Sequence, residues 1–436
     1  MTTNTTEGSA GGNIVPISSG IVRGQPWDYN LRRTKTGEIK ATITNAEVLM
    51  SAPGLNDMFG FDVRSGQVLV LRKWPHAPTR DFREYPRGWD DKYDDLLARK
   101  WLETMGCLSA NRWLPAEAAY LVAQKRPMNL LVDRLDRLPS WDGWSRFELA
   151  ARYMLGLTDR VQISTAALFL RKWMLGGVAR AKKPGCQMDN MLVLEGLQGI
   201  GKTTLIKILA LEDKWYVEVD NLDNQKELGE VILGKWIVGL SELSALYRYQ
   251  LANVKASLSR TSDSYRPAYA RASCSFARSA VFAGCTNEDV YLRDPTGARR
   301  FWPIKCGDKI DLNWARDNVE QLWAEVIFAY WYWKEEWWLS GIDNLLAIQE
   351  QDKRLESPLW EMETIELFSG PAYQFGNTLR LTDAMKAVRD RGIETKGITG
   401  QALGRVLSEA GWVKKRDKDG SVTMGKGRMY WEKRDA

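Results

Sequence analysis

The sequence has 436 residues, of which 44% are hydrophobic and 27% charged, and its formal net charge is +6. This composition is typical of globular proteins and excludes a fibrous or wholly disordered chain, and the length predicts two or three domains. The single histidine, His76, excludes metal sites built from several histidines, and the five scattered cysteines argue against a zinc site or a disulfide framework. The most hydrophobic stretch, residues 322–339, contains charged residues, so we expect a tryptophan-rich helix packed on the core and no membrane span.

The N-terminal third of the chain shows no catalytic pattern. Residues 1–30 are rich in Thr, Ser, Gly and Asn, which predicts a disordered segment. Residues 31–139 predict a mixed, mostly helical accessory region, with a strand over 39–45 and an amphipathic helix over 92–105. We expect four acidic residues of this region to face solvent or to cap that helix: Asp90, Asp91, Asp94 and Asp95. Residues 140–187 predict a helical segment that leads into the next domain.

Residues 196–203 match the P-loop pattern with the sequence Gly-Leu-Gln-Gly-Ile-Gly-Lys-Thr. In such a loop the backbone N–H groups surround a polyphosphate, Lys202 reaches the β- and γ-phosphates, and the Thr203 hydroxyl holds Mg²⁺. A strand-like run over 191–195 and helical spacing over 204–210 flank the loop, which favours this interpretation over a glycine turn in an unrelated fold. The pattern predicts an ATP and Mg²⁺ site that includes Gly196, Gln198, Gly199, Ile200, Gly201, Lys202, Thr203 and Thr204.

Two further strands are predicted to carry the other parts of this site. The strand over 235–242 ends in Glu242, which we expect to hold Mg²⁺ through water or to orient the attacking water; the alternative is an ordinary glutamate at a helix start. The strand over 279–286 is followed by Asn287, which we expect to contact the γ-phosphate or the attacking water; the alternative is a turn residue.

Basic residues after the strand that ends in Glu242 suggest contacts with a neighbouring subunit and with DNA. Arg299 and Arg300 are predicted to complete the site of a neighbouring subunit, with a solvated basic turn as the alternative. Residues 260–271 read as a hairpin whose tip combines cations with an aromatic ring. This combination suits single-stranded DNA, although a purely structural hairpin fits the pattern as well; the predicted contacts are Arg266, Tyr269 and Arg271.

The C-terminal segment is basic and has its own predicted fold. The ATPase core is expected over 188–340, and residues 341–364 read as a polar linker. Residues 365–436 contain 14 Lys and Arg against 9 Asp and Glu, and they predict two helices followed by a hairpin, a winged-helix pattern. We expect four basic residues of the hairpin to contact duplex DNA phosphates: Lys414, Lys415, Arg416 and Arg428.

The motifs together resemble the virulence-associated E family, whose members occur in phages and mobile elements and are related to superfamily-3 replicative helicases. The resemblance rests on residues 194–204, 234–243, 260–271 and 286–302, and residues 141–143 and 178–185 match the usual lead-in. It implies an α/β, AAA+-like ATPase in the cytoplasm of a bacterial host. It further implies assembly into a homo-oligomeric ring, with a hexamer expected, and translocation on single-stranded DNA held by the hairpin in the ring channel.

The chain departs from the family pattern at Gly239, where the family usually has a glutamate, so only Glu242 of the acidic pair is present. This departure concerns the rate of hydrolysis rather than nucleotide binding. The leading functional interpretation is an ATP-dependent DNA helicase acting in replication of a phage or mobile element. The alternative is a nucleotide-switched DNA-binding initiator or regulator that does not unwind DNA.

Overall fold

The computed structural model describes residues 30–436, except 79, 109–110, 221–224, 241–253, 266–273, 293–297, 356–358, 370–376, 394–397, 399, 417–428 and 434–436. The chain divides into two compact units. The first consists of Met1–Leu138 and Leu233–Lys235, and the second of Pro139–Ile232 and Trp236–Ala436.

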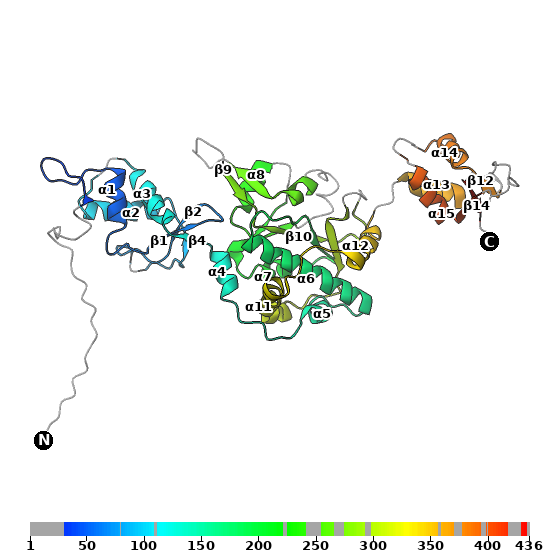
Figure 1. Ribbon diagram of the computed structural model, residues 1–436, viewed down its shortest axis with the longest axis horizontal. Coiled ribbons are helices and arrows are strands. Elements are labelled where there is room, and N and C mark those ends of the chain that lie inside the picture. The colour runs from blue at the N-terminus through cyan, green and yellow to red at the C-terminus, as the bar shows by residue number, and fades with distance from the viewer. Residues whose placement is uncertain are drawn as a thin grey trace, which may run out of the picture. The chain divides into compact units, whose positions relative to one another are not determined.

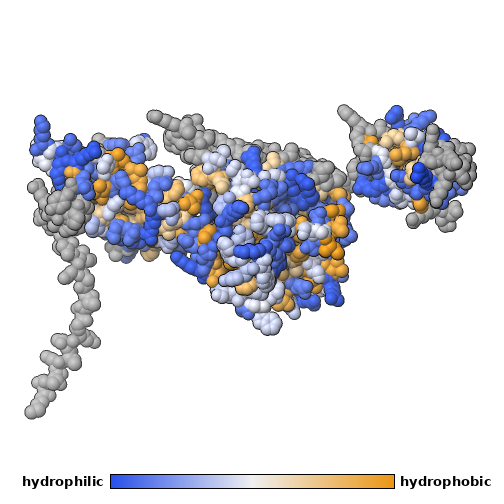
Figure 2. Space-filling model, viewed as in Figure 1, coloured by the Kyte–Doolittle hydropathy of each residue, from blue (hydrophilic) through white to orange (hydrophobic). Residues whose placement is uncertain are grey.

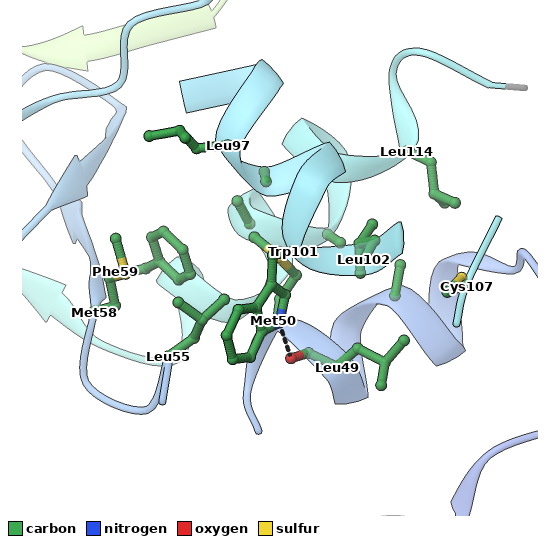
Figure 3. Close-up of a cluster of buried hydrophobic side chains, with 14 of the residues drawn as sticks. Leu49, Met50, Leu55, Met58, Phe59, Leu97, Trp101, Leu102, Cys107 and Leu114 are labelled. Atoms are coloured by element: carbon green, nitrogen blue, oxygen red, sulfur yellow. Dashed lines mark hydrogen bonds between the residues drawn. The ribbon is translucent and has the colours of Figure 1, made fainter. Parts of the chain in front are cut away.

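The first unit packs helices against a small mixed sheet. The sheet has four strands in the order β3-β2-β1-β4, with β1 antiparallel to β2 and parallel to β4. Its elements are α1 (Ile43–Met50), β1 (Phe59–Asp62), β2 (Gln67–Val70), β3 (Arg87–Gly88), α2 (Asp94–Thr104), α3 (Leu114–Gln124), β4 (Pro127–Met128) and α4 (Leu130–Asp136). Figure 3 shows the core, in which the indole N–H of Trp101 donates a 2.9 Å hydrogen bond to the carbonyl of Leu49.

Helix α1 replaces the strand predicted over residues 39–45. Thr42 is the N-cap residue, and its side chain accepts a hydrogen bond from the N–H of Asn45. A threonine N-cap stabilises a helix start, and here this local bond prevails over the β-propensity of the Ile and Thr residues around it. The strand prediction was therefore wrong, whereas the amphipathic helix predicted over 92–105 is confirmed by α2.

Asp94 corrects the expectation that the acidic cluster faces solvent. Its side chain is fully buried, pairs with Arg87 and accepts a 2.7 Å hydrogen bond from the indole N–H of Trp74. Asp90 behaves as predicted, because its carboxylate accepts the N–H of Tyr93 at the start of α2. A buried carboxylate is stable only when it is paired, and the partners of Asp94 precede it by 7 and 20 residues, outside the acidic run itself.

The second unit is built on a parallel five-stranded sheet, ordered β11-β5-β10-β7-β6. The fold is therefore of the mixed α/β type. Its elements up to residue 305 are α5 (Phe147–Leu149), a π-helix (Ala150–Met154), α6 (Arg160–Lys182), β5 (Met191–Glu195), α7 (Lys202–Leu209), a 3-10 turn (Asp213–Trp215), β6 (Tyr216–Glu218), α8 (Gln225–Ile232), β7 (Ile237–Leu240), β8 (Ser262–Tyr265), β9 (Cys274–Ala277), β10 (Val281–Thr286) and β11 (Phe301–Lys305).

Three helices pack together on this sheet: α6, α7 and α11 (Leu312–Phe328) (Figure 1). The buried rings of Trp236 and Trp323 lie 4.3 Å apart between them, and the indole of Trp173 donates to the carbonyl of Phe282. Helix α11 continues as a π-helix (Ala329–Trp333) whose large rings are exposed: Trp331, Tyr332 and Trp333. The prediction of a packed tryptophan-rich helix therefore holds only for its first part. Among the described residues, none of the helices has the length and apolar character needed to cross a membrane.

The segment predicted as a linker, residues 341–364, is instead largely helical. It contains α12 (Gly341–Asp352) and the start of α13 (Leu359–Ser369). Helix α12 packs on the edge strand β11, and the side-chain amide of its buried Gln351 donates to the carbonyl of Phe301. The linker prediction was wrong because α12 buries only a narrow face, Ala347 and Gln351, so the sequence carries little of the apolar spacing that marks a helix.

The C-terminal part has its own hydrophobic core around Phe368, Leu403, Trp412 and Trp431. Its elements after α13 are β12 (Thr378–Leu379), α14 (Leu381–Asp390), α15 (Gly400–Glu409), β13 (Trp412–Arg416) and β14 (Met429–Lys433), with the sheet order β12-β14-β13. The two predicted helices and the antiparallel hairpin are confirmed. Figure 2 shows hydrophilic residues spread over the visible face of each part, with hydrophobic residues between them.

Candidate functional site

The loop between β5 and α7, predicted as a P-loop, is shaped by glycines with positive φ angles. Gly196, Gly199 and Gly201 have φ angles of +142°, +84° and +105°, which are values that favour glycine. Gly201 is the N-cap of α7 and has no side chain that could accept a hydrogen bond from the first N–H groups of the helix. The first N–H groups of α7 are therefore available for an anion.

Lys202 is folded back onto this loop. Its buried ammonium donates hydrogen bonds of 2.7 Å to the carbonyl of Gly196, 2.8 Å to the carbonyl of Leu197 and 2.8 Å to Oδ1 of Asn287. Burial lowers the pKa of Lys202. All three acceptors are neutral, so the positive charge has no counter-charge among the groups that bind it. A polyphosphate would supply that charge.

Asn287 reaches the loop because β10 lies beside β5. The two strands are parallel, with Thr286 opposite Glu195, so the residue after β10 comes next to the loop that follows β5. The structure therefore brings together two of the predicted site residues, Lys202 and Asn287.

Thr203 follows Lys202 in the first turn of α7, and its hydroxyl lies 3.8 Å from the sulfur of Cys285. Burial raises the pKa of Cys285 to about 11, so it is a neutral thiol and a weak acceptor. The Thr203 oxygen can therefore exchange this contact for a metal ion, which fits a nucleotide-bound Mg²⁺. The described residues contain no group of three His, Cys, Asp or Glu side chains that could hold a metal ion alone. Mg²⁺ in nucleotide sites needs few protein ligands, because phosphates and water complete its coordination.

Glu242, the predicted acid, lies outside the described residues. The strand before it, β7, ends at Leu240 and pairs with β10 in parallel. The strand predicted to lead to Glu242, β7, and the strand that precedes Asn287, β10, are thus neighbours, and β10 lies between β7 and β5, the strand that precedes the loop.

Arg299 and Arg300 lie at the end of the sheet where its parallel strands begin, whereas the loop lies where they end. They precede β11, and the carbonyl of Arg300 accepts a 2.8 Å hydrogen bond from the N–H of Met191, at the start of β5. The loop follows the other end of β5, about 17 Å away for five residues of strand. Neither arginine can therefore complete the site of its own chain. Arg299 is exposed, whereas Arg300 is partly buried and its Nε donates a 3.2 Å hydrogen bond to the hydroxyl of Ser259.

The predicted contacts of single-stranded DNA, Arg266, Tyr269 and Arg271, lie outside the described residues. The arms that flank them, β8 and β9, form the predicted antiparallel hairpin, with Ser262 opposite Ala277. An ion pair between Asp263 and Arg278 holds the base of this hairpin.

The basic residues of β13 are exposed but do not share one face. Lys415 pairs with Glu432 on β14, and strand alternation places it on the other face from Lys414 and Arg416. The fourth predicted contact, Arg428, lies outside the described residues. The three described residues are therefore divided between the two faces of the hairpin.

The sequence analysis missed the role of Glu195, the residue before the loop. It is 1% exposed, accepts a 2.8 Å hydrogen bond from the hydroxyl of Tyr291, and pairs with Arg354 at 2.7 Å. A cavity of about 270 Å³ borders this pair between α6, β11 and α12. The strand pattern of residues 191–195 contains no signal for the pair, because Arg354 is supplied by the segment taken for a linker.

Comparisons with known proteins place the chain in a family. No curated protein sequence matches the chain. Two solved structures, both A-form apo structures of the NrS-1 C-terminal region, are 13% and 14% identical, with TM-scores of 0.43 and 0.45. Each match covers 86% of this chain and 96% of the other. The virulence-associated protein E-like domain matches residues 135–356, half of the chain, which include the loop, Asn287 and both arginines. The chain belongs to the virulence-associated protein E-like family.

Proposed function

We propose that this chain is an ATP-driven DNA helicase or translocase that acts in replication of a phage or mobile genetic element. The observation that carries the proposal is the contact between Lys202 and Asn287 at the glycine loop. It joins a lysine that could reach a bound phosphate and a polar strand-end residue in one place, and hydrolysis of a γ-phosphate uses groups of both kinds.

The residues of the proposed nucleotide site would have the following roles. The loop N–H groups and the first turn of α7 bind the phosphates, and Lys202 moves from the loop carbonyls to the β- and γ-phosphate oxygens. Asn287 orients the γ-phosphate or the attacking water. Thr203 and Glu242 would hold Mg²⁺, which neutralises phosphate charge when bound. Glu242 would also orient the water.

A ring of subunits, expected to be a hexamer, explains the position of the arginines. Since neither can reach its own loop, a neighbouring chain is the partner that gives Arg299 or Arg300 a catalytic role. An arginine supplied from another chain stabilises the charge of the transition state by orders of magnitude. The exposed Arg299 is the better candidate, because Arg300 already binds Ser259.

DNA contacts are proposed at two places. Arg266, Tyr269 and Arg271 would hold single-stranded DNA in the ring channel, with phosphates on the arginines and a base on the ring. The C-terminal part, with the element order helix, strand, helix, helix, strand, strand, supports a winged-helix domain that binds duplex DNA. In the double variant Arg266→Ala/Arg271→Ala, stimulation of ATP turnover by single-stranded DNA should be lost while basal turnover remains.

A second candidate is a nucleotide-switched DNA-binding initiator or regulator, favoured by Gly239 in place of a second acid. Strand displacement on a forked DNA substrate separates the two functions. The helicase proposal expects displacement that requires ATP and is absent in Lys202→Ala. Filter binding of the same fork should remain in that variant. If the chain binds the fork only with ATP but displaces no strand at any enzyme concentration, the result would favour the regulator.

A further inference from the structure

The cavity of about 270 Å³ lies at the edge strand β11 of the five-stranded sheet. Gln162 and Thr165 of α6 line it with a side-chain amide and a hydroxyl. Its volume is slightly below the range of about 300–1,000 Å³ that is typical of small-molecule sites, so it fits one ring system rather than a whole nucleotide. Four residues form its apolar walls: Leu157, Ala166, Pro303 and Ile304.

The charged side chains around this cavity balance one another. Each of the three acidic and three basic residues takes part in an ion pair: Glu195 with Arg354, Glu350 with Lys353, and Asp289 with Lys305. A bound ion would have to compete with one of these pairs, which a neutral ligand does not. The lining therefore favours a neutral group with apolar faces and a polar edge.

Strand β11 turns alternate backbone groups away from the sheet. The N–H of Cys306 faces β5, to which it donates a 2.9 Å hydrogen bond. Backbone groups of successive residues in a strand point to opposite sides, so those of Phe301, Pro303 and Lys305 face outward. Gln351 of α12 fits this orientation, because its side-chain amide donates to the carbonyl of Phe301 from outside the sheet.

Two of these outward groups lie at the cavity, one an acceptor and the other a donor. Pro303 has no N–H and contributes only its carbonyl, and Lys305, two residues on, contributes its N–H. Neither group has a hydrogen-bond partner in the part of the chain that the structure describes. An acceptor followed by a donor matches the edge of adenine, where the 6-amino group donates and the adjacent N1 accepts. Guanine has the reverse order there, with O6 as acceptor and N1–H as donor.

The cavity and the loop between β5 and α7 share part of their walls. Glu195, at the cavity, directly precedes the loop residue Gly196. After Lys305 the chain continues along the loop, where the N–H of Ile310 donates a 3.2 Å hydrogen bond to the carbonyl of Ile200. A nucleotide bound by its phosphates at the loop can therefore extend its base into the cavity.

We propose that this cavity is the base site of the nucleotide and takes adenine, with the 6-amino group on the carbonyl of Pro303 and N1 on the N–H of Lys305. This proposal rests on the proposed nucleotide site, because the loop would hold the phosphates. The site then prefers ATP to GTP. Guanine would place its O6 against a carbonyl and its N1–H against an N–H, and polar groups left unpaired in a site lower affinity.

A series of ligands measures this preference in the parent chain. Isothermal titration calorimetry gives the affinities for ATP, GTP, purine riboside triphosphate and inorganic tripolyphosphate. Purine riboside triphosphate lacks the 6-amino group, so it should bind about 3- to 10-fold more weakly than ATP, the effect of one neutral hydrogen bond. GTP should bind more weakly still. Equal affinities for the three nucleotides would overturn the proposal.

The variant Lys305→Pro removes the outward N–H. A proline is tolerated in an edge strand where its nitrogen faces away from the sheet, so the bonds between β11 and β5 remain. Lys305→Ala is the matched control, because it loses the same side chain and keeps the N–H. Lys305→Pro should bind ATP about 3- to 10-fold more weakly than Lys305→Ala, with equal affinities for tripolyphosphate. Equal ATP affinities of the two variants would contradict the contact with N1.

Gln162→Trp fills the cavity from the exposed first turn of α6. It should weaken ATP binding at least about tenfold, as expected when the fit of a pocket is lost, and leave tripolyphosphate binding unchanged. Val161→Trp is the control, since Val161 is the exposed neighbour and does not line the cavity. Parent-like ATP affinity in Gln162→Trp, or an equal loss for ATP and tripolyphosphate, would overturn the proposal. If the parent binds neither ATP nor tripolyphosphate, the proposed function fails; if it binds tripolyphosphate and all three nucleotides equally, only the base site fails.

Discussion

Lys202 and Asn287 are 85 residues apart in the sequence, and the ammonium of one donates a 2.8 Å hydrogen bond to the side-chain oxygen of the other. The contact exists because the parallel strands β5 and β10 are neighbours and both end at the same edge of the sheet. A lysine held in this way by neutral acceptors is ready to bind a phosphate at little cost, because it exchanges weak partners for charged ones.

Substitution of Lys202 by alanine should abolish most ATP turnover. We expect a loss of at least about 10²-fold, since a preorganised charge that meets the phosphates is removed. Lys207→Ala is the matched control, because Lys207 lies on the same helix, is exposed and pairs only with Asp213 among the described residues. Steady-state ATPase assays check both variants. Near-parent turnover in Lys202→Ala would show that the loop is not the nucleotide site.

Asn287→Ala should reduce hydrolysis more than binding. The variant keeps Lys202 and the loop N–H groups, so ATP affinity should change by only a few-fold. Turnover should fall about 10²-fold, the scale for loss of one polar group aimed at the transition state. Comparison of kcat with the dissociation constant of an ATP analogue measures the two effects separately. A loss confined to affinity would mean that Asn287 only holds Lys202 and does not act on the γ-phosphate or the attacking water.

The ion pair of Glu195 and Arg354 should matter for stability. Both side chains are buried, so Arg354→Ala leaves an uncompensated carboxylate next to Tyr291. Removal of one partner of a buried pair costs about 3–5 kcal/mol in the free energy of unfolding. Lys353→Ala removes the neighbouring, exposed partner of Glu350 and should cost less than about 1 kcal/mol. Urea denaturation compares them, and similar losses in both variants would contradict the structural role of the pair.

The local parts of the fold could be predicted from the sequence because each carries its own signal. The strand, glycine loop and helix over 191–210 combine an apolar run, glycines and helical spacing. The hairpin from Trp412 to Glu432 is likewise marked by two short runs that contain bulky residues, with a Lys-Asp-Gly sequence between them. In the site, the shared location of Lys202 and Asn287 followed from the P-loop pattern around Lys202 and from the position of Asn287 at a strand end.

The remaining features depend on contacts between distant residues. The close approach of the Tyr216 side chain to Gly239 requires β6 to lie next to β7, which no local sequence pattern predicts. Asp94 is buried because Arg87 and Trp74 bind it, although a run of acidic residues usually faces solvent. Helix α12 was missed because its buried face is narrow and partly polar.

The arginine pair gives a prediction about assembly. Arg299→Ala should lower ATP turnover at least about 10²-fold, whereas Arg300→Ala should act mainly through its bond to Ser259 and lose less. A mixture of Arg299→Ala chains with Lys202→Ala chains should recover part of the activity. Such a mixture contains interfaces with an intact loop from one chain and an intact arginine from the other. Absence of recovery, with mixed assemblies confirmed by light scattering, would mean that Arg299 does not act between chains.

We expect the two faces of strand β13 to contribute unequally to duplex DNA binding. Lys414 and Arg416 share a face, while Lys415 lies on the other face and is paired with Glu432. The double variant Lys414→Ala/Arg416→Ala should weaken duplex binding at every sequence tested. It should also reduce the slope of log K against log salt by about 1.8, since each lost phosphate contact removes about 0.9.

Lys415→Ala should change this slope by less than one contact, because its charge is already balanced by Glu432. Lys305→Ala is the control, as an exposed lysine paired with Asp289 outside the C-terminal part. Fluorescence anisotropy of a labelled duplex over a range of KCl concentrations measures all four proteins, the parent included. A slope reduced equally by Lys415→Ala and by the double variant would show that both faces of the hairpin contact DNA. An unchanged slope in every variant would move the duplex-binding surface away from β13, to the helices α14 and α15.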